Sequence, residues 1–161
     1  MTHVYIGVGS NQEAEYNLCT CIKALREVLG ELQISTIYRS KAIGFEGDDF
    51  LNVVIGFETQ QSVSELKTLF KQLEQAQGRQ ADQAKFSSRR LDIDLLLYGE
   101  QIDPALKLPH PDILQYPFVL FSLLELQPQL LHPVLQQPLI DLVPQTHLST
   151  VGLTPINLSC L

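Results

Sequence analysis

Residues 87–99 read Ser-Ser-Arg-Arg-Leu-Asp-Ile-Asp-Leu-Leu-Leu-Tyr-Gly. From Asp92 onward this pattern predicts a β-strand that becomes fully buried over residues 95–97. Successive side chains alternate between the two faces of a strand, so Asp92 and Asp94 share one face. Two neighbouring carboxylates repel each other and are costly to desolvate, which predicts a cation beside them. Mg²⁺ fits because it binds oxygen ligands and keeps positions for water and phosphate; the alternative is a solvated strand end with a surface ion pair.

The segments before this strand alternate between strand and helix patterns. Residues 4–9 predict a strand, and the amphipathic helix that follows is capped by Asn11 and ends at Gly30. Residues 32–38 and 50–59 predict two further strands. The second of these is apolar on both faces, so we expect it at the centre of a sheet.

A second amphipathic helix opens at a capping box formed by Ser62 and Glu65 and runs to about Gln77. With the strand from Asp92, the order is β, α, β, β, α, β, which predicts an α+β fold. The expected architecture is a ferredoxin-like βαββαβ sandwich with C-terminal additions, in which one mostly antiparallel sheet carries both helices on one face. A buried third helix over residues 118–126 is one of these additions.

Gly7 and Gly9 in the first strand have two possible explanations. A dinucleotide-binding turn would need a third glycine at position 12, where this chain has Gln12. The two glycines therefore indicate a tight turn or close backbone packing.

The composition is that of one globular domain over residues 1–161, with 45% hydrophobic and 18% charged residues and a predicted tail over 145–161. The formal net charge of −7 argues against binding to nucleic acid or to an anionic membrane. A local basic cluster stands out against this acidic background and consists of Arg79, Lys85, Arg89 and Arg90. Such a cluster is either a phosphate-binding loop or a solvated loop.

The chain contains three cysteines, Cys19, Cys21 and Cys160. The number is odd, no metal-ligand spacing is present, and no signal peptide or long apolar span precedes them. These features predict reduced thiols in a soluble, cytoplasmic protein, which we expect to be a monomer.

Several short motifs follow one another in a specific order. They are residues 5–11, Tyr38-Arg39-Ser40, Phe50-Leu51-Asn52, residues 73–79, residues 89–95, Pro109-His110-Pro111 and Phe118-Val119-Leu120. This combination resembles the 6-hydroxymethyl-7,8-dihydropterin pyrophosphokinase family of folate biosynthesis, and the similarity extends to about Pro144. The resemblance implies transfer of the β,γ-pyrophosphoryl group of ATP to the hydroxymethyl oxygen of a reduced pterin.

The resemblance also implies roles for individual residues. Asp92 and Asp94 would hold two Mg²⁺ ions and act in catalysis together with Arg89. The residues implied to contact ATP are Glu74, Arg79, Arg89 and His110, and those implied to contact the pterin are Ser40, Ile43, Phe50, Asn52 and Phe118. Residues 79–89 would form a mobile lid over the phosphates. Structural alternatives are core packing (Phe50, Phe118), a satisfied strand amide (Asn52), a turn cap (His110) and a surface ion pair (Glu74 with Arg79).

Two positions depart from the family pattern. Arginine is usual in the family where this chain has Ala81 and, six residues after His110, Tyr116. Loss of a donor that stabilises developing charge costs about 2.7–4 kcal/mol of transition-state stabilisation. Three hypotheses follow, namely an active pyrophosphokinase, a pterin- or nucleotide-binding paralogue with weak or no transferase activity, and a ferredoxin-like interaction module. The last leaves Asp92 and Asp94 unexplained.

Overall fold

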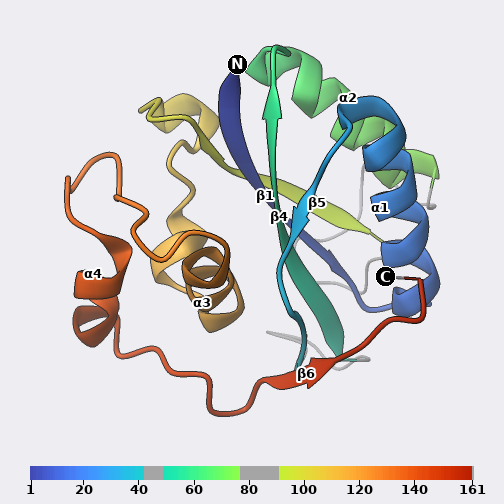
Figure 1. Cartoon of the computed structure of the whole chain (residues 1–161). Helices are drawn as coiled ribbons and strands as arrows, with labels where there is room; N and C mark the ends of the chain where they lie inside the picture. Colours follow the sequence, from blue (N-terminus) through green and yellow to red (C-terminus); the bar gives the residue numbers. More distant parts are fainter. Residues whose placement is uncertain (42–48, 77–90, 161) are drawn as a thin grey trace.

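The structure, a computed structural model, describes residues 1–41, 49–76 and 91–160 (Figure 1). The strands in these ranges are β1 (Thr2–Ser10), β2 (Gln33–Ile34), β3 (Ile37–Ser40), β4 (Phe50–Thr59), β5 (Asp92–Tyr98) and β6 (Thr154–Ile156). The α-helices are α1 (Ala14–Leu29), α2 (Val63–Ala76), α3 (Pro117–Leu126) and α4 (Leu139–Thr146). Two short 3₁₀ turns are η1 (Pro104–Leu106) and η2 (Pro111–Leu114).

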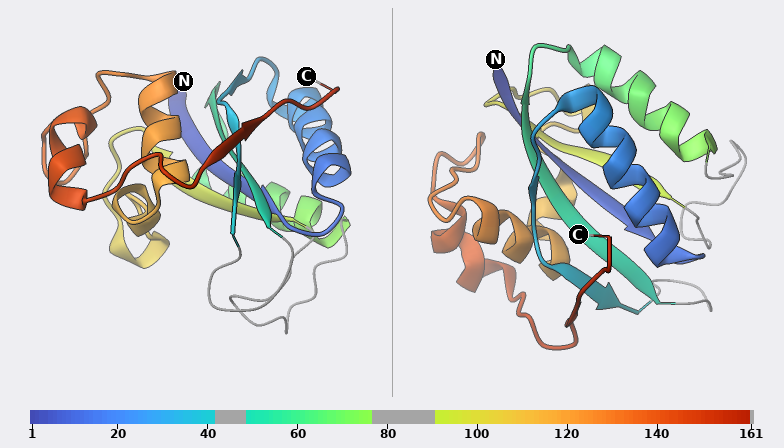
Figure 2. Two further views of the ribbon diagram at one scale, coloured as in Figure 1. Left: turned by 90° about the horizontal axis from the view of Figure 1, so that it is seen from below. Right: turned by 45° about the vertical axis from the view of Figure 1, so that its right-hand side comes forward.

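One antiparallel sheet organises the described part of the chain. Its strand order is β5-β1-β4-β3-β6, and β2 also pairs with β4. Helices α1 and α2 cover one face of the sheet, α3 lies against the other face, and α4 packs beside α3 (Figures 1 and 2). The predicted βαββαβ order, the antiparallel sheet and the shared face of the first two helices are therefore confirmed.

Each face of the sheet has its own hydrophobic cluster. On β1, Val4, Ile6 and Val8 pack toward α1 and α2, whereas Tyr5 packs toward α3. Strand β4 is buried on both faces along most of its length, which confirms the central position predicted for residues 50–59. Because period-two alternation sends alternate residues to opposite layers, the odd-numbered positions of β1 are available to shape the α3 side.

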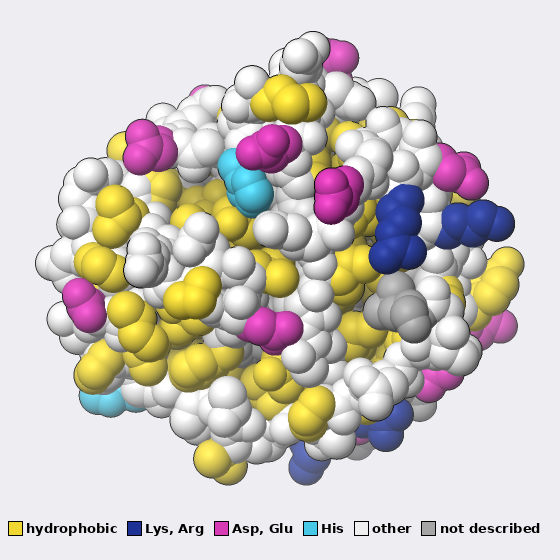
Figure 3. Space-filling model, in the orientation of Figure 1, with side chains coloured by type: hydrophobic (Ala, Val, Ile, Leu, Met, Phe, Trp, Pro, Cys, Tyr) yellow, Lys and Arg dark blue, Asp and Glu magenta, His cyan; other side chains and the backbone are white. Residues whose placement is uncertain are grey.

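Hydrophobic side chains also lie on the surface over α3 and α4 (Figure 3). The most exposed of those from the end of α3 through the first turn of α4 are Leu131, Val134, Leu135 and Ile140. None of the helices in the described ranges is both long and apolar enough to cross a membrane.

The helix termini follow the sequence prediction in part. Ser62 and Glu65 form the predicted capping box, since Glu65 N donates to Ser62 Oγ (3.1 Å) and Ser62 N donates to Glu65 Oε1 (3.2 Å). Gly30 follows the last residue of α1, as predicted, with a φ of 84°. The prediction for Asn11 is wrong: the chain bends over residues 11–13, and α1 begins only after Glu13.

The predicted strand over residues 32–38 is interrupted between β2 and β3. Ser35 N donates to Val54 O, and Ser35 Oγ accepts from Val54 N, both at 2.9 Å. Thr36 N donates to the carboxylate of Glu125 on α3, at 2.9 and 3.1 Å. This carboxylate comes from a residue 89 positions later, so local sequence did not reveal the break.

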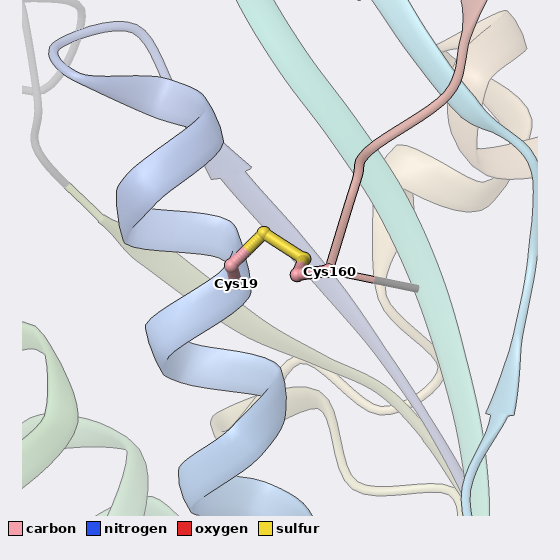
Figure 4. The surroundings of a disulfide bond; sticks show 2 residues. All are labelled: Cys19 and Cys160. Atoms are coloured by element: carbon pink, nitrogen blue, oxygen red, sulfur yellow. A yellow bond between two sulfur atoms is a disulfide. The ribbon is translucent and has the colours of Figure 1, made fainter.

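The C-terminal segment is anchored rather than a featureless tail. Strand β6 pairs with β3, and Cys160 forms a disulfide with Cys19 on α1, with the two Cα atoms 5.9 Å apart (Figure 4). The prediction of reduced thiols is wrong for this pair and right for Cys21, which is buried and free. The bonded cysteines are 141 residues apart, so their spacing gave no sign of the pairing. Cysteine content consequently no longer supports a cytoplasmic location.

Candidate active site

A cavity of about 830 Å³ lies over the sheet, on the face that carries α3. All eight predicted site residues in the described ranges line it, namely Ser40, Phe50, Asn52, Glu74, Asp92, Asp94, His110 and Phe118. The other three, Ile43, Arg79 and Arg89, lie outside the described residues, as do Ala81 and the predicted lid over 79–89. The fold thus brings the eight residues together, and the role of each stays a prediction.

Two glycines of β1 form the floor of this cavity. Gly9 pairs with Asn52 of β4 on one side and with Asp92 of β5 on the other. Gly7 pairs with Asp94 on β5 in the same way. Because neither glycine has a side chain, the space above β1 stays open between the amide on β4 and the carboxylates on β5. The glycines lie inside a strand, so they serve close packing and not a nucleotide-binding turn.

Four carboxyl groups surround the β5 side of the cavity. Burial, together with the negative charges of Asp92, Asp112 and Glu74, raises the pKa of Asp94 to about 8. Asp94, Asp112 and His110 each offer a potential ligand atom, and these atoms lie within 4.8 Å of one another. A divalent cation beside Asp94 would stabilise its charged form. Clustered carboxylate oxygens are the ligands that Mg²⁺ prefers, so the residues present fit this ion.

His110 is held between the edge of β5 and η2. Its backbone N donates to Leu96 O (3.0 Å), and its Nδ1 accepts from Asp112 N (3.1 Å). Burial lowers the pKa of His110, which favours the neutral ring. With Nδ1 as acceptor, the proton of the neutral ring lies on Nε2, which can then donate a hydrogen bond. The alternative of a turn cap is also correct, because His110 caps η2.

The β4 side of the cavity has a polar centre and aromatic walls. Asn52 Nδ2 donates to Ser40 Oγ (2.8 Å), which fixes the amide while 9% of the residue remains exposed. Phe50 enters from the first residue of β4 and Phe118 from the first turn of α3. Both rings are half-buried and line the cavity, so core packing alone does not describe them.

Glu74 connects α2 to the outer edge of β5. Its Oε2 accepts from Ile93 N at 2.8 Å. A second cavity of about 540 Å³ lies beside this contact and shares Glu74, Asp94, Lys107 and His110 with the first. Its other polar lining includes Lys67 and Lys71 of α2 and Gln75. The acidic cluster therefore lies where an aromatic cavity meets a cavity that carries lysines.

Sequence reasoning missed Asp112. It belongs to the acidic cluster only because η2 turns the chain back toward β5, where His110 N contacts Leu96 O. A signal was present, since Asp112 stands two residues after His110 in a Pro-His-Pro-Asp sequence.

Comparison with known proteins adds a family to this geometry. Residues 5–128 match the family described as 7,8-dihydro-6-hydroxymethylpterin-pyrophosphokinase. A 2-amino-4-hydroxy-6-hydroxymethyldihydropteridine pyrophosphokinase from Aquifex aeolicus is 37% identical over 152 residues, which are 92% of this chain and 94% of that protein. The protein of the same name from Haemophilus influenzae is 32% identical over 139 residues, 83% of this chain and 86% of that protein.

A solved structure supports the fold independently. The crystal structure of Plasmodium falciparum HPPK-DHPS superposes with a TM-score of 0.70 at 12% sequence identity, over 97% of this chain and 47% of that chain. This chain thus spans about half the length of that protein. At this level of identity the likeness shows the fold alone.

Proposed function

Because the chain belongs to the 7,8-dihydro-6-hydroxymethylpterin-pyrophosphokinase family, we propose that it transfers the β,γ-pyrophosphoryl group of ATP to 6-hydroxymethyl-7,8-dihydropterin. The hydroxymethyl oxygen forms a bond to Pβ and loses its proton, and the bond between Pβ and the α,β-bridging oxygen breaks to release AMP. The observation that carries the proposal is the row Asn52, Gly9 and Asp92 across three strands, which sets an amide and an acidic cluster on opposite sides of one open floor.

The β4 side fits the pterin. A flat heterocycle gains most from face contact with aromatic rings, which Phe50 and Phe118 supply. Asn52 offers one donor and an acceptor to the polar edge of such a ring, because its other N–H is bonded to Ser40 Oγ. Its bond to Ser40 holds the amide in place before the ligand arrives, which reduces the entropic cost of binding.

The β5 side fits Mg²⁺. We propose that Asp92 and Asp94 hold two ions, with Asp112 close enough to join them. When bound, the ions would neutralise the triphosphate and make the pterin hydroxyl easier to ionise. The contribution of the protein to this arrangement is preorganisation, because folding already holds these carboxyl groups together, against their desolvation and mutual repulsion, before the ions arrive.

The second cavity fits the nucleotide. It adjoins the acidic cluster, and Lys67, Lys71 and Lys107 supply positive charge around it. His110 would donate from Nε2 to a phosphate oxygen, an interaction that a neutral ring makes without competing for the metal. Arg79 and Arg89 are proposed to close over the phosphates from the region between α2 and β5.

The test is product analysis with ATP, 6-hydroxymethyl-7,8-dihydropterin and Mg²⁺. We expect AMP and a pterin diphosphate in equal amounts, and no AMP when the pterin is omitted or Mg²⁺ is chelated. Release of ADP, or AMP release that does not depend on the pterin, would contradict pyrophosphoryl transfer.

Tyr116 favours a second candidate, a pterin-binding paralogue with weak transferase activity. Burial and the charge of Asp112 raise the pKa of Tyr116, so its side chain is neutral and supplies no charge for phosphate. A single-turnover rate typical of fast pyrophosphoryl transfer would exclude this candidate. Tight pterin binding without AMP formation would support it.

A further inference from the structure

We propose that Tyr116 is a positioning residue of the pterin subsite, where its ring holds the ring of Phe118 in the cavity. The identity of the ligand rests on the proposed function, whereas the arrangement of the two rings rests on the structure alone. In the family pattern this position holds an arginine that would contact phosphate. The inference instead assigns Tyr116 a role in the affinity for the pterin.

The backbone of Tyr116 is fixed on both sides. Its N donates to Asp112 O (3.1 Å), which ties it to η2. Its O accepts from Val119 N and Leu120 N, both at 3.1 Å, which ties it to the first turn of α3. Its extended conformation, with a φ of −123° and a ψ of 129°, ends one element and begins the next. The Cα–Cβ bond of Tyr116 therefore has a defined direction.

This backbone brings two rings together that stand two residues apart in the sequence. The ring centroids of Tyr116 and Phe118 are 5.4 Å apart and the ring planes differ by 12°, which is a stacked pair. Both residues line the larger cavity and both are half-buried. Each ring thus has part of its surface against the other and part open to the cavity.

A stacked partner changes what Phe118 can do for a ligand. An unsupported, half-exposed phenylalanine samples several rotamers and loses that freedom when a ligand stacks on it. Against the Tyr116 ring, Phe118 has fewer rotamers before binding, so less entropy is lost. Stacked aromatic pairs change affinities by roughly 2- to 10-fold beyond their buried area.

The hydroxyl of Tyr116 is uncharged near neutral pH, so it can donate a hydrogen bond but cannot neutralise phosphate. The stacked contact with Phe118 is made by the ring and not by the hydroxyl. The inference therefore predicts that phenylalanine replaces Tyr116 and that a long cation does not.

The experiment measures equilibrium binding of 6-hydroxymethyl-7,8-dihydropterin without nucleotide, and of MgATP without pterin, for the full chain and four variants. Tyr116→Phe keeps the ring, Tyr116→Leu and Tyr116→Met replace it with a smaller apolar side chain that is not aromatic, and Tyr116→Arg replaces it with a cation. We expect Tyr116→Phe to bind the pterin with wild-type affinity. The other three variants should bind the pterin roughly 2- to 10-fold more weakly. The Leu and Met variants should bind MgATP with an affinity within twofold of wild type. In steady-state kinetics, the Leu and Met variants should have a higher KM for the pterin and an unchanged kcat, because the ring contributes equally to binding of the substrate and of the transition state.

Wild-type pterin affinity in both Tyr116→Leu and Tyr116→Met would overturn the inference. Equal weakening of pterin and MgATP binding would also overturn it, since that pattern indicates general disruption of the site. If the wild-type chain itself does not bind the pterin, the proposed function is contradicted. If it binds the pterin and the substitutions at residue 116 do not change the affinity, only the inference about Tyr116 is contradicted.

Discussion

A Cβ atom on Gly9 would lie 3.0 Å from Oδ1 of Asn52, closer than carbon and oxygen normally approach. We expect Gly9→Ala to displace the Asn52 side chain by a few tenths of an ångström, to weaken its bond with Ser40 and to weaken pterin binding by roughly 2- to 10-fold, the effect of losing about one hydrogen bond. Gly7→Ala is the matched control, since its Cβ would lie 3.6 Å from the nearest Leu96 side-chain atom, an ordinary contact. Equal pterin affinity in both variants, measured by titration, would show that Asn52 does not depend on Gly9.

The acidic cluster predicts opposite effects of one substitution on stability and activity. Asp94→Asn removes a carboxyl group whose charged form is disfavoured in the folded chain by burial and by neighbouring carboxylates, so the melting temperature at pH 7 to 8 without Mg²⁺ should rise by a few degrees. The same variant should lose AMP formation and any gain in melting temperature on adding Mg²⁺. Thermal unfolding in chelator and in excess Mg²⁺ checks both effects. A lower melting temperature in chelator, together with an undiminished response to Mg²⁺, would remove Asp94 from the metal site.

Whether a feature of this fold could be predicted from the sequence depends on how far apart in the sequence its interacting residues lie. Strand β4 was predicted with its observed bounds, because ten residues that are apolar on both faces fit only a central strand. The capping box at Ser62 was predicted because all its partners lie within one turn. The break at Thr36 was not, since it depends on Glu125 from a helix that packs on the sheet only in the folded chain.

The same distinction between local and distant interactions applies to the residues of the candidate site. Asp92 and Asp94 were found from strand periodicity alone, whereas the grouping of Asn52, His110 and Phe118 with them came from a family resemblance. Neither approach predicted that Tyr116 stacks on Phe118, because the sequence predicts a helix from Phe118 onward, and residues two apart do not face each other on a helix. The stack exists because an extended residue is followed at once by a helix.

Lys107 is predicted to support nucleotide binding from the junction of the two cavities. It lines both cavities and has a left-handed backbone, with a φ of 54°, that few residues other than glycine adopt. Lys107→Gln should raise the KM for MgATP about fivefold or more and have little effect on the pterin, as expected for loss of a charge-assisted contact. Lys41→Gln is the control, because Lys41 lines only the larger cavity in the described structure. If the two variants have the same KM for MgATP, Lys107 does not contact the nucleotide.

His132 predicts how stability responds to acid. Its Nδ1 accepts from Val134 N (3.3 Å) and Leu135 N (3.2 Å), and burial lowers its pKa. The unfolded chain then binds a proton more readily than the folded chain, so this stabilisation is complete above about pH 6.5 and is lost as the pH falls below that value. His132→Asn keeps an acceptor that does not titrate and should lose less melting temperature between pH 7.5 and pH 5 than wild type. His147→Asn, at an exposed histidine, should show the wild-type slope; a wild-type slope in both would refute the role of His132.

The Cys19–Cys160 disulfide is expected to hold β6 on the edge of the sheet. It closes a loop that spans nearly the whole chain, with a sequence separation of 141, so its loss should lower the free energy of unfolding by about 2–5 kcal/mol. Cys160→Ser should therefore melt at a lower temperature than wild type in the absence of reductant, and reductant should bring wild type to the same temperature. Cys21→Ala should keep its sensitivity to reductant, because Cys21 is not bonded. Amide hydrogen exchange would show where the effect lies. On reduction of the disulfide, we expect faster exchange in β6 and in its partner β3. Unchanged exchange in both strands would show that pairing with β3 holds β6 in place without the disulfide.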